Sequence, residues 1–194
     1  LSDTVAGQTI RFADNLSTPV LTTTANGYHL ELLGTATNVS AANTTTTFLN
    51  TGNLVLGNAA GDTLTFAGGL TATAPAAINA AGTLGTTNAA MSLGDSNTAL
   101  TLTADVALHT AGGSLTLGGA VNGSTANTES LSLNAGTTGA VSVTGAVGQT
   151  TSLKTLTLTN SNGATFNSAV TTGTSVLLSD TVAGQTIRFA DNLS

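Results

Sequence analysis

Residues able to carry acid–base chemistry are few and scattered along this chain of 194 residues. Catalysis by a carboxylate pair needs two acidic groups held close together with different pKa values. The nine carboxylates stand at wide and irregular spacings: Asp3, Asp14, Glu31, Asp62, Asp95, Asp105, Glu129, Asp180 and Asp191. The basic residues are Arg11, Lys154 and Arg188, too isolated to complete a carbohydrate-cleaving site. We therefore predict no catalytic residue and expect the chain not to be an enzyme.

Metal and cofactor binding finds equally little support. The chain has no cysteine and two histidines, His29 and His109. His29 has one carboxylate, Glu31, two residues along the same strand face, which is weak support for a metal site. The segment 57–66, GNAAGDTLTF, is the nearest approach to the glycine-rich calcium repeat of some solenoids, and it lacks the glycine rhythm. We predict no metal site and no cofactor.

The charge balance narrows the classes of partner. The net charge is −6, and only three residues are basic, too few to neutralise a nucleic-acid backbone. Nucleic acid is therefore not an expected partner. No apolar run approaches the roughly 18 residues of a membrane-spanning helix, so we expect no transmembrane segment in this stretch.

The rest of the composition favours short β-strands. Hydrophobic residues make up 40% of the chain, which argues against disorder, but aromatic residues only 3%. A core must then be built from Leu, Val, Ile and Ala. Aliphatic residues alternate with Thr or Ser in many short pieces, which predicts strands with one apolar face. The clearest pieces are 28–34, 53–58, 62–69, 99–105, 114–121, 130–136, 140–147, 155–160 and 175–180.

Frequent Gly and Asn between these pieces indicate tight turns rather than helices. Coils of roughly 20 residues with two or three short strands each are typical of a parallel β-solenoid, or β-helix. The sequence predicts an all-β fold of this kind, with about eight or nine coils per repeat. The alternative is an array of β-sandwich domains, which the short strands and the absence of Trp disfavour.

One segment occurs twice. Residues 1–17, LSDTVAGQTIRFADNLS, are identical to residues 178–194. A weaker copy, GDTLTFAGGLTA at 61–72, aligns with GQTIRFADNLST at 7–18. We interpret residues 1–194 as one continuous solenoid segment, slightly more than one 177-residue repeat of a longer array. The strand TVAGQTIRFAD is expected to join neighbouring repeats, through the junction residues Thr4, Val5, Ile10, Phe12, Thr181, Val182, Ile187 and Phe189.

Three longer stretches suggest a family. Residues 99–121, 130–148 and 155–178 resemble the β-strand-repeat regions of giant bacterial surface proteins, a group that includes filamentous-haemagglutinin-like and autotransporter-type adhesins. The likeness lies in composition and rhythm, over about residues 50–194, and no single motif carries it. It implies a secreted or cell-surface fibre, stalk or adhesin, and it carries over no functional residue.

Two functions follow as hypotheses. The first is a structural repeat of a long extracellular or cell-surface bacterial fibre, whose partners are copies of itself. The second is an adhesin that binds glycans or other cells through its outward Thr/Asn-rich face. An adhesive site should show aromatic side chains for sugar stacking, and the candidate stretch is 18–50, with Tyr28, His29 and Phe48.

Overall fold

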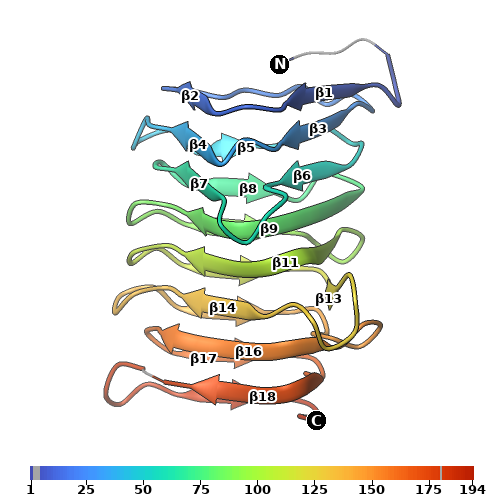
Figure 1. Cartoon of the computed structure of the whole chain (residues 1–194). Helices are drawn as coiled ribbons and strands as arrows, with labels where there is room; N and C mark the ends of the chain where they lie inside the picture. The colour runs from blue at the N-terminus through green and yellow to red at the C-terminus, as the bar shows by residue number, and fades with distance from the viewer. Residues whose placement is uncertain (2–4, 180) are drawn as a thin grey trace.

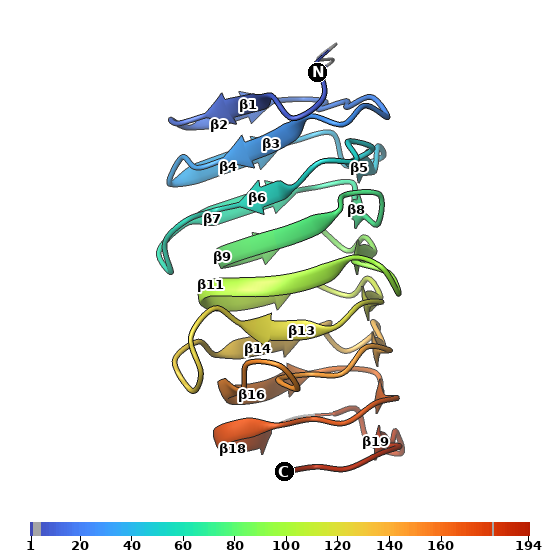
Figure 2. The same ribbon diagram turned by 90° about the vertical axis from the view of Figure 1, so that its right-hand side faces the viewer.

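The computed structural model is a parallel β-solenoid, in which the chain descends from the N-terminus to the C-terminus in stacked coils (Figures 1 and 2). It describes residues 1, 5–179 and 181–194. Every pairing between the described strands is parallel, which confirms the predicted solenoid over an array of antiparallel β-sandwiches. The described residues form no helix, and hence no helical segment that is long and apolar enough to cross a membrane.

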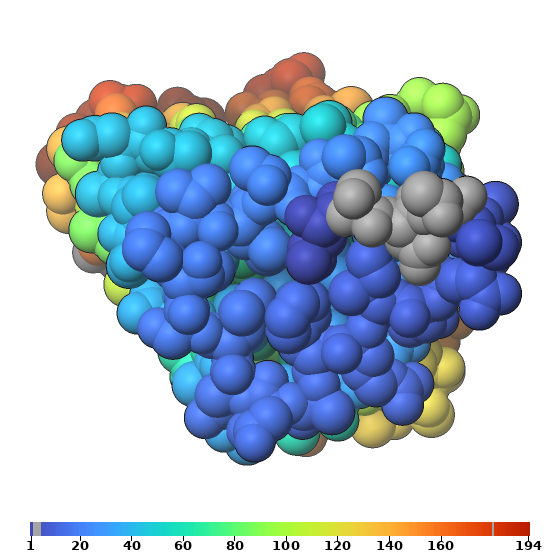
Figure 3. All heavy atoms as spheres, turned by 90° about the horizontal axis from the view of Figure 1, so that it is seen from above, coloured from blue at the N-terminus to red at the C-terminus, as the bar shows by residue number. Residues whose placement is uncertain are grey.

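The strands form three faces, which we number in the order that the chain visits them. Figure 3, viewed along the axis, shows an outline closer to a triangle than to a disc. Face 1 holds β1 (Thr9–Phe12), β3 (His29–Leu32), β6 (Leu54–Leu56), the first parts of β9 (Ala77–Gly85) and β11 (Ala99–His109), and β13 (Val121–Gly123). Single bridges at Val147, Val170 and Leu193 continue face 1.

The other two faces are stacked in the same manner. Face 2 holds β2 (Leu16–Thr18), β4 (Ala36–Val39), β7 (Thr63–Phe66), the second parts of β9 and β11, β14 (Leu131–Asn134), β16 (Leu153–Asn160) and β18 (Thr172–Leu178). Face 3 holds β5 (Thr46–Thr47), β8 (Leu70–Ala72), β10 (Met91–Leu93), β12 (Leu115–Leu117), β15 (Val141–Val143), β17 (Ala164–Phe166) and β19 (Ile187–Phe189).

The length of each coil can be counted along one inward rung of face 1. Its members pair in register from one coil to the next: Ile10, Leu30, Leu54, Ile78, Leu100, Val121, Val147, Val170 and Leu193. The rung thus takes eight steps from Ile10 to Leu193, and an average coil has roughly 23 residues, as is usual for solenoid repeats. The shortest coil runs from Ile10 to Leu30 and the longest from Val121 to Val147, because the loops at the corners differ in length.

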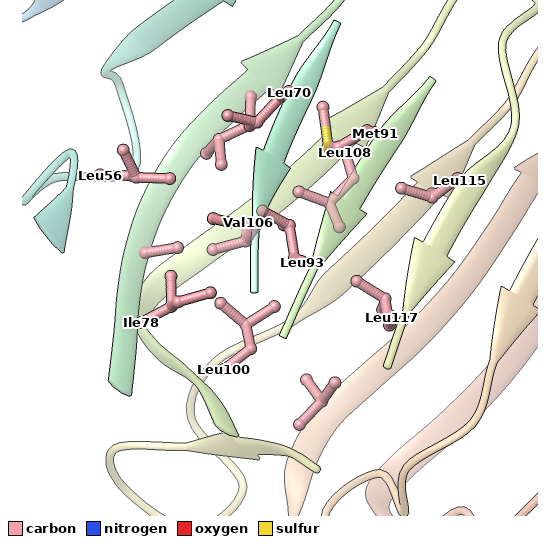
Figure 4. Close-up of a cluster of buried hydrophobic side chains, with 14 of the residues drawn as sticks. Leu56, Leu70, Ile78, Met91, Leu93, Leu100, Val106, Leu108, Leu115 and Leu117 are labelled. Carbon is pink, nitrogen blue, oxygen red and sulfur yellow. The ribbon is translucent and has the colours of Figure 1, made fainter. Parts of the chain in front are cut away.

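The core is a narrow column of aliphatic side chains inside the three faces. Along β6, β12 and β15 the residues alternate buried, half-buried, buried, as the alternation of aliphatic and hydroxyl residues predicts. Figure 4 shows how leucines from faces 1, 2 and 3, such as Leu100, Leu108 and Leu117, converge at the centre. Each such side chain contributes about 1.5–3 kcal/mol by burial.

Glycine allows the corners to stack as closely as the strands. A Cβ built on Gly145 would lie 2.1 Å from the carbonyl oxygen of Gly119, one coil away. No side chain fits in that space, so the corner after face 3 requires glycine there. The close backbone contact keeps the rungs of neighbouring coils in register.

Candidate functional site: the two end coils

The N-terminal end of the solenoid exposes part of the apolar core. Ile10 and Phe12 on β1 and Leu16 on β2 point inward and pack against the core, yet each is only partly buried. Val5, in the turn before β1, is 54% exposed. The reason is geometric: inward residues in a solenoid are covered by coils on both sides, and among the described residues Ile10, Phe12 and Leu16 have a complete coil on one side.

The C-terminal end has the same character. Val176 on β18, together with Ile187 and Phe189 on β19, is partly buried. Phe189 stacks on Phe166 of the coil before it, with ring centroids 4.7 Å apart and planes 6° apart. Leu178 and Leu193 continue inward rungs, pairing with Leu158 and Val170, but they remain 46% and 50% exposed. The last coil thus presents an apolar surface.

Both end coils also present strand edges. β1 pairs with β3, and β19 pairs with β17, each along one edge among the described residues. An edge strand offers N–H and C=O groups to any further strand that approaches in register. Apolar surface and open strand edges together are the features of a stacking interface.

The predicted junction residues form two half-sites at opposite ends of the molecule, not one site. Ile10, Phe12, Ile187 and Phe189 point toward the core. Val182 lies in the turn before β19, where its N–H donates to the Ser161 carbonyl over 3.0 Å. The neighbouring Thr181 hydroxyl lies 3.3 Å from that of Ser161. Thr4 falls outside the described residues.

The sequence prediction missed Leu16, Val176, Leu178 and Leu193 as members of the end surfaces. Leu16, Leu178 and Leu193 belong to the repeated 17-residue segment, so the signal was present. The alternation of inward and outward residues, carried past the bend at residues 13–15, would have identified Leu16 and Leu193 as inward.

Charge distinguishes the two end coils. At the N-terminal end the Arg11 Nε donates to the Glu31 Oε2 over 2.6 Å, between outward residues paired across β1 and β3. The two side chains are 59% and 20% exposed, so the pair contributes about 0–1 kcal/mol. Arg188 is the identical position of the second copy, and no described residue forms an ion pair with it.

The remaining candidate groups serve local structure. The His29 Nδ1 accepts the Asn53 N–H over 2.8 Å, while Glu31 binds Arg11, so the two side chains do not share a ligand. Glu129 is buried and accepts from the Ser124 hydroxyl and the Thr125 N–H. Within the part of the chain that the structure describes, no cluster of three or more His, Asp or Glu side chains is suited to a metal ion.

A shallow hollow lies on the outside of face 2. Its volume is about 240 Å³, below the roughly 300–1,000 Å³ of ordinary ligand sites. The polar side chains that line it are Thr83, Asp105, Ser130, Ser132 and Thr157. The Asp105 carboxylate already accepts the Ser130 N–H over 2.8 Å.

The aromatic residues predicted as a sugar platform lie in the core. Tyr28 and Phe48 are fully buried, and Phe48 packs edge-on against Phe66 with ring centroids 5.8 Å apart. These rings fill the coils near the N-terminal end and cannot stack on a ligand from solvent.

Comparisons of this chain with protein-family models, with curated proteins and with solved structures gave no match.

Proposed function

We propose that this chain is one repeat of a long extracellular or cell-surface bacterial fibre, in which copies of the repeat extend a single solenoid. The repeat acts mechanically: parallel strand pairing runs without interruption along the axis and carries load. The partners are the preceding and following copies of the same sequence. The low charge, the absence of cysteine and the resemblance to bacterial surface proteins support the extracellular location.

One observation carries the proposal. The strand of the repeated segment pairs along one edge in the first copy and along the opposite edge in the second. β1 pairs with the coil after it, and β19 pairs with the coil before it. Within an array, a single copy of the segment makes both sets of contacts. Its strand then has neighbours on both edges, and no apolar end surface remains.

The two copies are alike enough locally for this combination. Gly7 and Gly184 have φ angles of 79° and 84° in the preceding turn. After the strand, the Asn15 N–H donates to Asp14 Oδ1 over 2.7 Å, and the Asn192 N–H to Asp191 Oδ1 over 2.8 Å. The turn before the strand and the bend after it thus have the same local geometry in both copies, although the neighbouring coil lies after the first copy and before the second.

Cryo-electron microscopy of tandem chains tests the proposal. Chains of one, two and four repeats should appear as single rods that lengthen by about 37 Å per repeat, from strands about 4.8 Å apart along the axis. The one-repeat chain, residues 1–194, is the control for width and density. Separate beads without an axial spacing of about 4.8 Å would contradict the fibre.

The hollow on face 2 favours a second candidate, an adhesin that binds glycans through its hydroxyl-rich surface. The hydroxyls could donate hydrogen bonds to sugar hydroxyls and accept hydrogen bonds from them, and the Asp105 carboxylate could accept them. A glycan-array comparison of the unmodified chain with Asp105→Ala and Thr157→Val tests it. Equal absence of binding in all three would remove this candidate and leave the fibre proposal untouched.

A further inference from the structure

The two copies of the repeated segment lie on different faces of the solenoid. In the first copy, Thr9–Phe12 forms β1 on face 1, and Leu16 begins β2 on face 2. In the second copy, Ile187–Phe189 forms β19 on face 3, and Leu193 bridges to Val170 on face 1. The second copy is therefore displaced by one face relative to the first.

A change of local conformation does not explain the displacement. The glycine of the turn has a similar φ angle in both copies, and the bend after the strand has the same hydrogen bond. The same side chains point inward: Ile10 and Phe12 in one copy, Ile187 and Phe189 in the other. Residues 184–194 therefore have the same local structure as residues 7–17, at a different corner of the triangle.

The weaker third copy occupies the remaining corner. Residues 61–72 form β7 (Thr63–Phe66) on face 2 and β8 (Leu70–Ala72) on face 3, with the same spacing between the strands as in β1 and β2. The motif thus runs from face 1 to 2 at residues 7–18, from 2 to 3 at 61–72, and from 3 to 1 at 184–194. All three corners accept it.

We infer that successive repeats of the fibre are rotated by one face, about a third of a turn, because one repeat spans about seven and two-thirds coils. The coil length agrees, since a 177-residue repeat divided by the average coil gives roughly 7.7 coils. Three repeats then return to the starting face after about 23 coils. This inference rests on the proposed fibre and specifies the geometry of its junction.

The rotated junction has specific contacts. At the N-terminal end, the Leu1 carbonyl accepts from the Thr24 hydroxyl over 3.4 Å and from the Tyr28 hydroxyl over 3.3 Å. Leu178, the same position in the second copy, is then covered by the matching residues of the next repeat. Arg188 likewise faces the glutamate that corresponds to Glu31, and so obtains the ion pair that Arg11 makes here.

Site-specific labelling of a three-repeat chain measures the rotation. The chain has no cysteine, so a Ser96→Cys substitution in each repeat provides one biotin–streptavidin label per repeat. Ser96 is exposed at the corner between β10 and β11. Electron microscopy of labelled rods should show successive labels about 37 Å apart along the axis. They should leave the rod in three directions about a third of a turn apart.

A control places the label on one corner at two levels. Asn167, exposed after β17, lies at the same corner as Ser96, three coils further along. One-repeat chains labelled at Ser96→Cys or Asn167→Cys should show labels in one direction at different heights. Helical averaging of unlabelled arrays gives a second measurement, independent of both substitutions.

The outcomes separate the inference from the fibre proposal. Labels that rotate by thirds, or an averaged rotation near a third of a turn per repeat, support the inference. A continuous rod whose labels all lie on one side overturns the rotation but leaves the fibre intact. Rods that break into separate particles overturn both.

Discussion

Two leucines on the same rung show how an inner coil differs from an end coil. Leu108 on β11 is 0% exposed, whereas Leu178 on β18, three coils further along the same inward rung of face 2, is 46% exposed. Both occupy inward positions of parallel strands. The difference is that Leu108 has a coil on each side. Burial in this fold is therefore supplied mainly by neighbouring coils, and an end coil leaves inward side chains partly exposed.

The largest loss of stability is expected from a substitution in the core. Leu108→Ala should lower the free energy of unfolding by about 2–5 kcal/mol, because it leaves a cavity among close-packed side chains. Leu178→Ala should lower it by less than about 1 kcal/mol, because half of that side chain already meets water. Guanidinium unfolding followed by circular dichroism checks both.

A two-repeat chain tests whether the next repeat covers Leu178. There, Leu178→Ala at the internal junction should approach the effect of Leu108→Ala, because the next repeat covers the side chain. An unchanged small effect would show that the junction leaves the leucine exposed.

Glycine at an inner corner should give the next largest effect. Gly145→Ala forces a methyl group against the Gly119 carbonyl, so we expect a loss of about 3 kcal/mol, at the upper end for overpacked sites. Gly184→Ala is the matched end-coil control: its Cβ meets no atom within 4 Å, and only its φ of +84° is unfavourable, by about 1–2 kcal/mol. Equal midpoints of guanidinium unfolding for Gly145→Ala and Gly184→Ala would argue against close stacking of the corners.

A buried carboxylate provides a third comparison. Asp62 is 3% exposed and accepts the Asn58 and Ala59 N–H groups over 2.8 Å and 3.0 Å. Asp62→Ala should therefore lower stability by about 1–3 kcal/mol, because two backbone N–H groups lose a charged acceptor. Asp191→Ala removes a similar bond from an exposed bend and should change stability by less than about 1 kcal/mol. Amide hydrogen exchange at residues 58–59 should accelerate in the first variant alone.

The smallest effect concerns the ion pair. Arg11→Ala should lower stability by at most about 1 kcal/mol, and about 0.5 M NaCl should reduce that difference, because the pair is exposed. Arg188→Ala should change nothing in the one-repeat chain. In a two-repeat chain the arginine at the junction should gain the salt-sensitive contribution that Arg11 has here. Thermal melts at low and high salt are sufficient to compare each variant with its parent chain.

The sequence predicted the solenoid where aliphatic and hydroxyl residues alternate for several positions. Strands β6, β7, β14 and β16 lie within or close to the expected pieces. It failed for β9, Ala77–Gly85, where AINAAGTLG has too few large aliphatics to show a pattern. It also missed the short strands β5 and β10, because the segments around them, TTTTFLN at 44–50 and AAMSLGD at 89–95, show little alternation of aliphatic and hydroxyl residues.

The end surfaces were predicted in part, and their placement was not. Repetition alone predicted Ile10, Phe12, Ile187 and Phe189 as junction residues, and these side chains lie in the two end coils, partly buried against the core. Nothing in the segment states which face it occupies, because all three corners accept the same motif. The face that the second copy occupies depends on the total length of the coils between the copies. The length of each coil depends on its corner loops, and the alternation of residues does not predict where these loops begin and end.

The unequal coils have a mechanical consequence. Corner loops of different length, small in the coil from Ile10 to Leu30 and large in the coil from Val121 to Val147, make the rod thicker on some sides than on others. Corner loops lie outside the strand pairing, so a long loop widens one side of the rod and leaves the axial spacing of the coils unchanged. If the proposed repeats stacked without rotation, their wide corners would form one ridge along one side of the fibre. With the proposed rotation by a third of a turn, the wide corners would alternate among three sides, and the bending stiffness of the fibre would be similar in all directions.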